Sequence, residues 1–263
     1  MKVISLGLGV QSTTMYLMSS LGHIDRADYA IFADLSAEHP ETYQLLVFLK
    51  KWVKENDTGI PIISKRKSLY DDLLNKVNST GQNFTPIPAY TKSEKKEGML
   101  RRQCTNEYKI DAIVKAAREL HGLKPRQRMP MTEFWLGITL DEIMRMKDSQ
   151  LPRVQYVYPL IEKRLRRSDC LKWLKKHDFP TPVKSACFFC PYQGDNQWKR
   201  LKQKHPASWE KAVGIDRSIR NNSKKGAMEP IYLHRSLMPL EKIDFESQLD
   251  MFDGNCDGGY CGL

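Results

Sequence analysis

Short apolar runs alternate with amphipathic stretches along the first half of the chain. The runs are short enough for buried strands, and the stretches between them repeat their apolar positions at helical spacing. Strands are predicted at residues 2–6, 29–33, 60–63 and 133–138, and helices at 12–21, 40–54, 68–77 and 106–120. Such alternation predicts an α/β fold, with a parallel sheet covered by helices on both faces.

The alternation is interrupted twice. Residues 79–103 combine prolines, glycines and a charge run, which predicts a loop that serves as a lid or contacts a partner. Beyond about residue 165, short basic helices follow without strand alternation. We therefore predict a sheet domain over residues 1–165 and a small, mostly helical, cysteine-bearing extension over residues 166–263.

The chain is strongly basic. Its 263 residues carry a formal net charge of +11, and the sequence pI is about 9.3. Such a balance favours anionic partners, either a nucleic acid or a phosphorylated small molecule, although a merely solvated basic surface is the alternative. The lysines and arginines gather in clusters at 65–67, 92–96, 163–167, 199–204 and 224–225. DNA or RNA is therefore an expected partner, gripped in part by the 79–103 loop.

Cysteine content and hydropathy indicate the cellular compartment in which the protein is expected. Six cysteines are too few for a disulfide scaffold in a chain of this length. The apolar run at residues 3–10 is broken by a serine and two glycines, which is unlike a signal peptide. No apolar stretch approaches the ~20 residues that a spanning helix needs. We expect a cytoplasmic protein without a membrane partner.

A glycine- and serine-rich loop joins the first predicted strand to the first predicted helix, in the sequence Ser5-Leu-Gly7-Leu-Gly9-Val-Gln-Ser12. Backbone N–H groups at such a turn, together with the start of a helix, favour an anion. The loop lacks the Gly-Lys-Ser/Thr ending of a Walker A loop and the third glycine of a dinucleotide fingerprint. Glycines at such turns also occur for steric reasons alone. Asp34 ends the second predicted strand, where a parallel sheet binds its ligands.

Three cysteines are candidate metal ligands. Cys104 precedes a predicted helix, and Cys187 and Cys190 form a Cys-x-x-Cys pair. Three thiolates suit an iron–sulfur cluster or a zinc ion, with Cys256, Cys261 or no residue as fourth ligand. A structural zinc or a redox dithiol is the plainer interpretation. Cys170 lies on an apolar helix face and is predicted to belong to the core.

Taken in order, these motifs resemble the PP-loop ATP pyrophosphatase superfamily, and within it the phosphoadenosine phosphosulfate reductase-like family. The resemblance covers roughly residues 1–195. It is carried by Ser5–Ser12, Asp34–Thr42, Cys104–Lys109, Gly137-Ile138 with Arg145, and Cys187–Cys190. Several positions depart from the usual motifs. Gln11 stands where a PP-loop usually has an aspartate, as in the reductase-like branch, and Leu35-Ser36 replaces a Thr-Gly. Thr139 stands where the strand end often has an arginine, and Cys104-Thr105 replaces the cysteine pair of the adenylyl-sulfate reductases.

The resemblance implies a Rossmann-like, adenine nucleotide α-hydrolase-like domain that binds ATP with Mg²⁺. The implied nucleotide-binding residues are Ser5, Gly7, Gly9, Gln11, Ser12, Asp34 and Gly137, and Lys109 and Arg145 are the implied catalytic phosphate ligands. The leading function is ATP-dependent sulfur transfer to a nucleic acid or nucleotide that is first adenylated. Sulfur would come from a cysteine desulfurase or another donor, through a persulfide or a [4Fe–4S] cluster on Cys104, Cys187, Cys190 and Cys256. Zinc is the alternative metal.

Two other functions remain open at this point. In a phosphoadenosine or adenylyl sulfate reductase, a thiol of the C-terminal tail attacks the substrate sulfur, and Cys261 is the candidate for that catalytic role. In a non-catalytic nucleic-acid-binding module, the fold is kept without the chemistry. ATP–pyrophosphate exchange separates the sulfurtransferase from the other two, and thioredoxin-dependent sulfite release identifies the reductase.

Overall fold

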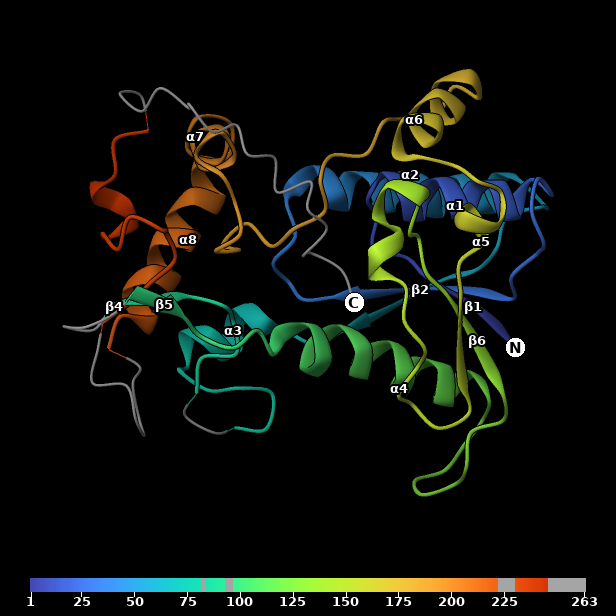
Figure 1. Ribbon diagram of the computed structural model, residues 1–263, viewed down its shortest axis with the longest axis horizontal. Coiled ribbons are helices and arrows are strands. Elements are labelled where there is room, and N and C mark those ends of the chain that lie inside the picture. The colour runs from blue at the N-terminus through green and yellow to red at the C-terminus, as the bar shows by residue number, and fades with distance from the viewer. Residues whose placement is uncertain (82–83, 93–96, 222–229, 246–263) are drawn as a thin grey trace. The chain divides into compact units, whose positions relative to one another are not determined.

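The computed structural model describes residues 1–81, 84–92, 97–221 and 230–245 (Figure 1). The chain forms two compact units, and each is assembled from stretches far apart in sequence. Unit 1 contains Met1–Asp34, Pro40–Arg66 and Asp111–Ser185, and unit 2 contains Leu35–His39, Lys67–Ile110 and Ala186–Leu263. This division differs from the predicted boundary at residue 165. The helix after that boundary packs on the first helix of unit 1, whereas residues 67–110 belong with the C-terminal helices.

Unit 1 is built on a five-stranded parallel sheet in the order β3-β2-β1-β6-β7. Its strands are β1 (Lys2–Ser5), β2 (Tyr29–Asp34), β3 (Ile62–Arg66), β6 (Thr132–Trp135) and β7 (Val154–Val157). The α/β parallel-sheet fold predicted from the sequence is confirmed, with four strands at or near their expected positions. The edge strand β7 was not predicted, because its polar residues hide the apolar pattern of a buried strand.

Helices cover both faces of this sheet. They are α1 (Val10–Ser20), α2 (Pro40–Glu55), α4 (Asp111–Leu120), α5 (Pro159–Glu162) and α6 (Arg167–Lys176), with a 3₁₀ segment, η2 (Leu140–Arg145). Figure 1 shows α1, α2, α5 and α6 on one face and α4 on the other. The core gathers side chains of β1, β2, α1, α2 and α6. Cys170 is fully buried in that core, as predicted, and burial raises the pKa of its thiol to about 12.

Unit 2 is mostly helical, with a small antiparallel sheet. Its elements are α3 (Leu69–Leu74), β4 (Tyr90–Lys92), β5 (Glu97–Met99), the π-helix η1 (Thr105–Ile110), α7 (Asp195–Lys204), α8 (Pro206–Ile219), β8 (Ile231–Tyr232) and η3 (Leu240–Lys242). The strand order is β5-β4-β8. The expectation of an irregular loop over 79–103 was therefore incomplete. The strands β4 and β5 are only three residues long, and β4 is completed by a partner from the end of the chain.

A buried polar network lies near the end of unit 2. The imidazole of His234 is 2% exposed, and its Nε2 lies 2.8 Å from a carboxylate oxygen of Asp195. Arg235 donates to the other oxygen of the same carboxylate at 2.6 Å. Burial lowers the pKa of His234, and Arg235 weakens the opposing effect of Asp195 by neutralising its charge. The folded chain therefore holds His234 neutral.

This network predicts a loss of stability in mild acid. An unfolded histidine takes up a proton below about pH 6.5, whereas folded His234 resists protonation, so the unfolded state binds more protons as the pH falls. The melting temperature should fall as the pH drops from 7 to 5, and the fall should be smaller in His234→Asn, which keeps a donor for Asp195. Calorimetric melting across this pH range checks the difference. An equal fall in both proteins would refute the assignment.

Over the described part of the chain, no helix has the length and apolar character needed to cross a membrane.

Candidate functional site

The carboxyl ends of β1 and β6 lie side by side at the centre of the unit 1 sheet. The chain leaves β1 toward β2 on one side, and returns on the other side as β6. In open α/β sheets this reversal of strand order opens a crevice for ligands. The loop predicted to bind phosphate, Ser5–Ser12, follows β1, and the predicted site residue Gly137 follows β6. The structure thus brings two separately predicted segments together where the strand order reverses.

The contact between these segments is close enough to require glycine. A Cβ atom on Gly137 would lie 2.7 Å from the backbone nitrogen of Ser12 and 2.8 Å from its Cα atom. Real Cβ atoms essentially never come that near to backbone. Gly137 therefore allows the β6 end to rest directly on the first turn of α1. The sequence alone marks Gly137 only through the family resemblance, since the contact is tertiary.

The start of α1 is suited to an anion. Its N-cap is Gly9, which has no side chain to satisfy the first N–H groups, and its first turn carries no acidic residue. Those N–H groups and the helix dipole then favour a negative ligand. The buried side chain of Leu8 anchors the loop, with a positive φ of 58°. The Oγ of Ser12 donates a long, 3.3 Å hydrogen bond to the Gly9 carbonyl, which a bound phosphate would displace readily.

Asp34 lies at the carboxyl end of β2, the neighbour of β1. Its carboxylate accepts a 2.7 Å hydrogen bond from the hydroxyl of Tyr43 on α2. The ring of Tyr43 packs edge-on against Phe32, with 6.5 Å between centroids. Asp34 is therefore held in one orientation by a packed aromatic side chain. Tyr43 was not among the predicted site residues, because nothing in the sequence reveals which side chain holds Asp34.

Arg145, one of the two predicted phosphate ligands, lies in unit 1 at the end of η2. Its guanidinium is 3.0 Å from the carboxylate of Glu142, one turn earlier in the same segment. Both side chains keep partial exposure, at 25% and 15%. Part of the positive charge of Arg145 is thus already balanced. Binding phosphate would require it to share or leave this partner.

The described cysteines of the predicted cluster lie in unit 2. Cys187 and Cys190 form a turn in which the Cys190 N–H donates to the Cys187 carbonyl at 2.9 Å. The two buried residues between them, Phe188 and Phe189, pack with Tyr70 of α3 and fix this turn in the unit. Cys104 stands just before η1, where its N–H donates to the Pro86 carbonyl at 2.8 Å. All three cysteines are partly exposed and none is in a disulfide.

A carboxylate that the sequence analysis did not single out connects this region to Lys109. Glu38 is 3% exposed, pairs by a backbone β-bridge with Cys187, and lies 3.8 Å from the Lys109 amine. Lys109, predicted to bind phosphate, therefore shares its charge with a buried acid beside the cysteine turn. Glu38 falls within the Asp34–Thr42 motif, but its partner comes from a distant part of the chain. Only the tertiary structure could identify it.

The predicted metal centre stays a prediction. Within the residues that the structure describes, no group of three or more His, Cys, Asp or Glu side chains is arranged to hold a metal ion. Two further candidates, Cys256 and Cys261, lie outside the described residues. The described side chains therefore do not by themselves make a site for an iron–sulfur cluster or zinc.

No protein-family model matches the sequence, and no curated protein matches it significantly. Among solved structures, the chain is similar to phosphoadenylyl-sulfate (PAPS) reductase from Candida auris, solved as a phosphate complex. The identity is 12% and the TM-score 0.45, over 69% of this chain and 74% of that one. At such values the fold assignment depends on this chain's own strand order, and the site on its own residues.

Proposed function

We propose that the protein is an ATP-dependent sulfurtransferase that binds an adenine nucleotide at the Ser5–Ser12 loop. One observation carries the nucleotide site: the close contact of Gly137 with Ser12, at the point where the strand order reverses. The arrangement presents backbone N–H groups at the start of α1, where the N-cap has no side chain to bond them. ATP fits such a cradle because its phosphates carry the charge that the helix start favours.

The site residues of unit 1 then have distinct roles. The loop glycines let the phosphates approach the backbone, and Asp34, oriented by Tyr43, would hold Mg²⁺ that accompanies ATP. Arg145 would exchange its contact with Glu142 for the departing pyrophosphate. An oxygen of the acceptor attacks the α-phosphorus, the bond to the β-phosphate oxygen breaks, and pyrophosphate leaves. The acceptor oxygen is now part of a good leaving group, AMP.

Sulfur delivery is assigned to the cysteine turn of unit 2. A sulfur donor, such as a cysteine desulfurase, first converts one thiol of the Cys187–Cys190 pair to a persulfide. The terminal sulfur attacks the acceptor carbon, the carbon–oxygen bond breaks and AMP leaves. The second thiol then attacks the resulting mixed disulfide, which frees the acceptor thiol and leaves a Cys187–Cys190 disulfide. An external thiol reductant restores the pair. This route uses no metal.

The acceptor is proposed to be DNA or RNA, because the chain carries a net charge of +11. ATP–pyrophosphate exchange tests the function. The wild-type protein, with Mg²⁺ and bulk RNA or DNA, should incorporate radiolabelled pyrophosphate into ATP. Thioredoxin-dependent sulfite release from a phosphoadenylyl-sulfate substrate, without exchange, would instead identify a reductase.

Asp34→Ala should weaken ATP binding at least tenfold, which corresponds to a loss of about 1.4 kcal/mol of binding free energy. Pyrophosphate exchange should fall as well, because it requires bound ATP. The reason is that the carboxylate fixed by Tyr43 is lost from the crevice edge, while the strand itself is unchanged. Isothermal titration with ATP and Mg²⁺ measures the effect. Asp57→Ala, which alters an exposed aspartate beyond α2, is the matched control and should bind as the wild type does. Unchanged affinity in Asp34→Ala would remove Asp34 from the site.

A further inference from the structure

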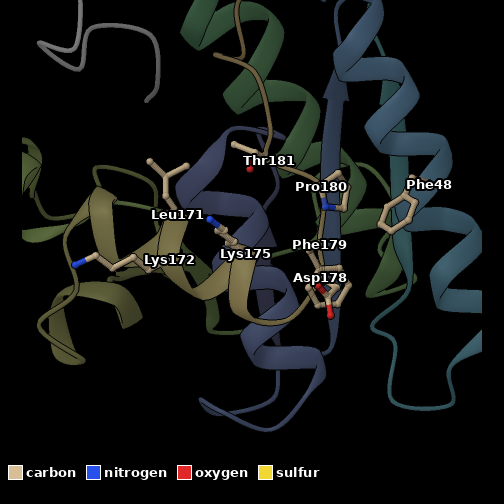
Figure 2. Close-up of a pocket in the computed structure, with 8 residues that line it drawn as sticks. All are labelled: Phe48, Leu171, Lys172, Lys175, Asp178, Phe179, Pro180 and Thr181. Carbon is tan, nitrogen blue, oxygen red and sulfur yellow. The ribbon is translucent and has the colours of Figure 1, made fainter.

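An open hollow of about 710 Å³ lies on unit 1, on the face covered by α2 and α6. It is lined by Phe48, Leu171, Lys172, Lys175, Asp178, Phe179, Pro180 and Thr181. Figure 2 shows α6 on one side, Phe48 of α2 on the other, and the 178–181 segment between them. The volume is in the range of small-molecule sites. None of these residues belongs to the proposed nucleotide site around the Ser5–Ser12 loop or to the Cys187–Cys190 turn.

The rim of the hollow is positively charged. Lys172 and Lys175 are three residues apart on α6, and therefore project from the same side of the helix. The amine of Lys172 lies 3.9 Å from the carboxylate of Asp169, a long and exposed ion pair that leaves the lysine available to a phosphate. Further exposed cations continue along the same stretch of chain, at Lys163, Arg164, Arg166 and Lys176. Exposed cations gathered in this way attract a polyanion, whose counterions are released on binding.

Aromatic rings line the hollow beside these lysines. Phe48 is 38% exposed, which is unusual for a phenylalanine on a well-packed helix. Phe179 is held in place by two other rings, since its ring centroid lies 5.7 Å from that of Trp52 and 6.1 Å from that of Trp173. A rigid ring and an exposed ring in a hollow that is also lined by lysines match the stacking surfaces that bind unpaired bases.

The polar lining distinguishes a base from an acidic peptide. Asp178 contributes a carboxylate, which repels the side chains of an acidic peptide but accepts hydrogen bonds from the amino groups of bases. Thr181 adds a hydroxyl that can donate or accept. Two lysines, two aromatic rings and a carboxylate acceptor in the lining together complement a nucleotide of a flexible strand.

We propose that this hollow binds single-stranded nucleic acid, with one unpaired base in the hollow and the flanking phosphates on Lys172 and Lys175. This inference deepens the proposed function, on which it rests for the role of the strand as sulfur acceptor. Binding itself depends only on the residues of the hollow. The contact differs from the predicted grip by the 79–103 loop, part of which forms the strands β4 and β5.

Fluorescence anisotropy with the full chain tests the proposal. The probes are fluorescein-labelled single-stranded RNA and DNA of about 12 nucleotides, and the DNA duplex of the same sequence. Lys172→Glu with Lys175→Glu should weaken single-strand binding at least tenfold. The slope of log K against log salt should shrink by about 1.4, or 0.7 per lost phosphate contact. Phe48→Ala should weaken binding at least about fivefold with an unchanged slope, because it removes stacking and no charge.

The matched control is Lys115→Glu with Lys124→Glu, which makes the same charge change at exposed positions on and after α4. It should alter affinity by less than about threefold. An equal loss in the control would mean that net charge alone drives binding. Duplex binding as tight as single-strand binding, or no effect of Phe48→Ala, would exclude a base from the hollow. If poly-glutamate competed as strongly as unlabelled oligonucleotide, the two lysines would be a binding site for acidic peptides instead. Each of these results overturns the proposal.

The proposed sulfurtransferase activity and the proposed nucleic-acid site in the hollow can be refuted independently. If the lysine pair matters for the oligonucleotides but no pyrophosphate exchange occurs, the hollow stands and the sulfurtransferase does not. If exchange occurs and none of the hollow variants changes oligonucleotide binding, the acceptor binds elsewhere. ATP titration of the lysine variant should give the wild-type affinity, because the phosphate cradle is built from other residues of unit 1.

Discussion

Gly137→Ala is expected to abolish most ATP binding, with affinity reduced at least tenfold. The added methyl carbon would lie 2.7 Å from the Ser12 nitrogen, so either the end of β6 or the first turn of α1 must move. The neighbouring atoms are backbone and cannot rotate away, unlike a flexible side chain. Overpacking of this kind also costs about 1–3 kcal/mol of stability. Isothermal titration and urea unfolding measure the two effects.

Gly214→Ala is the control for this substitution. Gly214 lies in α8, and a Cβ atom there would meet nothing within 4 Å. Alanine in a helix is favoured over glycine by about 0.5–1 kcal/mol, so this variant should be slightly more stable and bind ATP normally. If Gly137→Ala behaved like the control, the two segments would not form a cradle.

Asp216→Ala should cause the largest loss of stability, about 3–5 kcal/mol. Asp216 is 1% exposed, and its carboxylate accepts N–H bonds from Leu233 at 2.9 Å and Leu240 at 3.0 Å. It also forms an ion pair with Arg220. Burial raises the pKa of Asp216 despite that partner, so the pair is costly to bury. Removing the carboxylate leaves the largely buried guanidinium of Arg220 without its ion-pair partner, and two N–H donors without an acceptor.

Urea unfolding followed by circular dichroism measures this loss. Asp148→Ala, at an exposed position, should change stability by less than about 0.5 kcal/mol. A comparably small change in Asp216→Ala would show that the network around α8 relaxes without cost. Because the network joins α8 to β8 and η3, its loss should also loosen the unit that carries the cysteine turn.

The local pattern of apolar and polar residues was sufficient to predict most of the strands and helices of unit 1. The apolar runs at β1 and β2 and the amphipathic pattern of α2 fixed these elements, because each buries one continuous apolar surface. The parallel order followed from strand–helix alternation. β7 and β8 were missed, since one is a polar edge strand and the other is only two residues long. Elements of that kind are specified by their neighbours rather than by their own residues.

The residues of the candidate site likewise fall into those that the sequence identified and those that only the structure revealed. Motif spacing identified Asp34 and the Ser5–Ser12 loop, because both follow directly from strand ends. Tyr43, the buried Glu38 beside Lys109 and the hollow on α6 depend on contacts between distant segments. The interleaving of the two units could not be predicted either, because it depends on helix packing, such as that of α3 on α8. Sequence patterns specify which residues carry chemistry better than they specify which side chains orient them.

Amide hydrogen exchange with and without a non-hydrolysable ATP analogue and Mg²⁺ tests the nucleotide site most directly. We expect slower exchange at residues 6–12 and 136–138, the two segments joined by the contact of Gly137 with Ser12. We expect no change along α6, where a different ligand is proposed to bind. Protection confined to other segments, or none at saturating analogue, would contradict the placement of the nucleotide and with it the proposed adenylation chemistry.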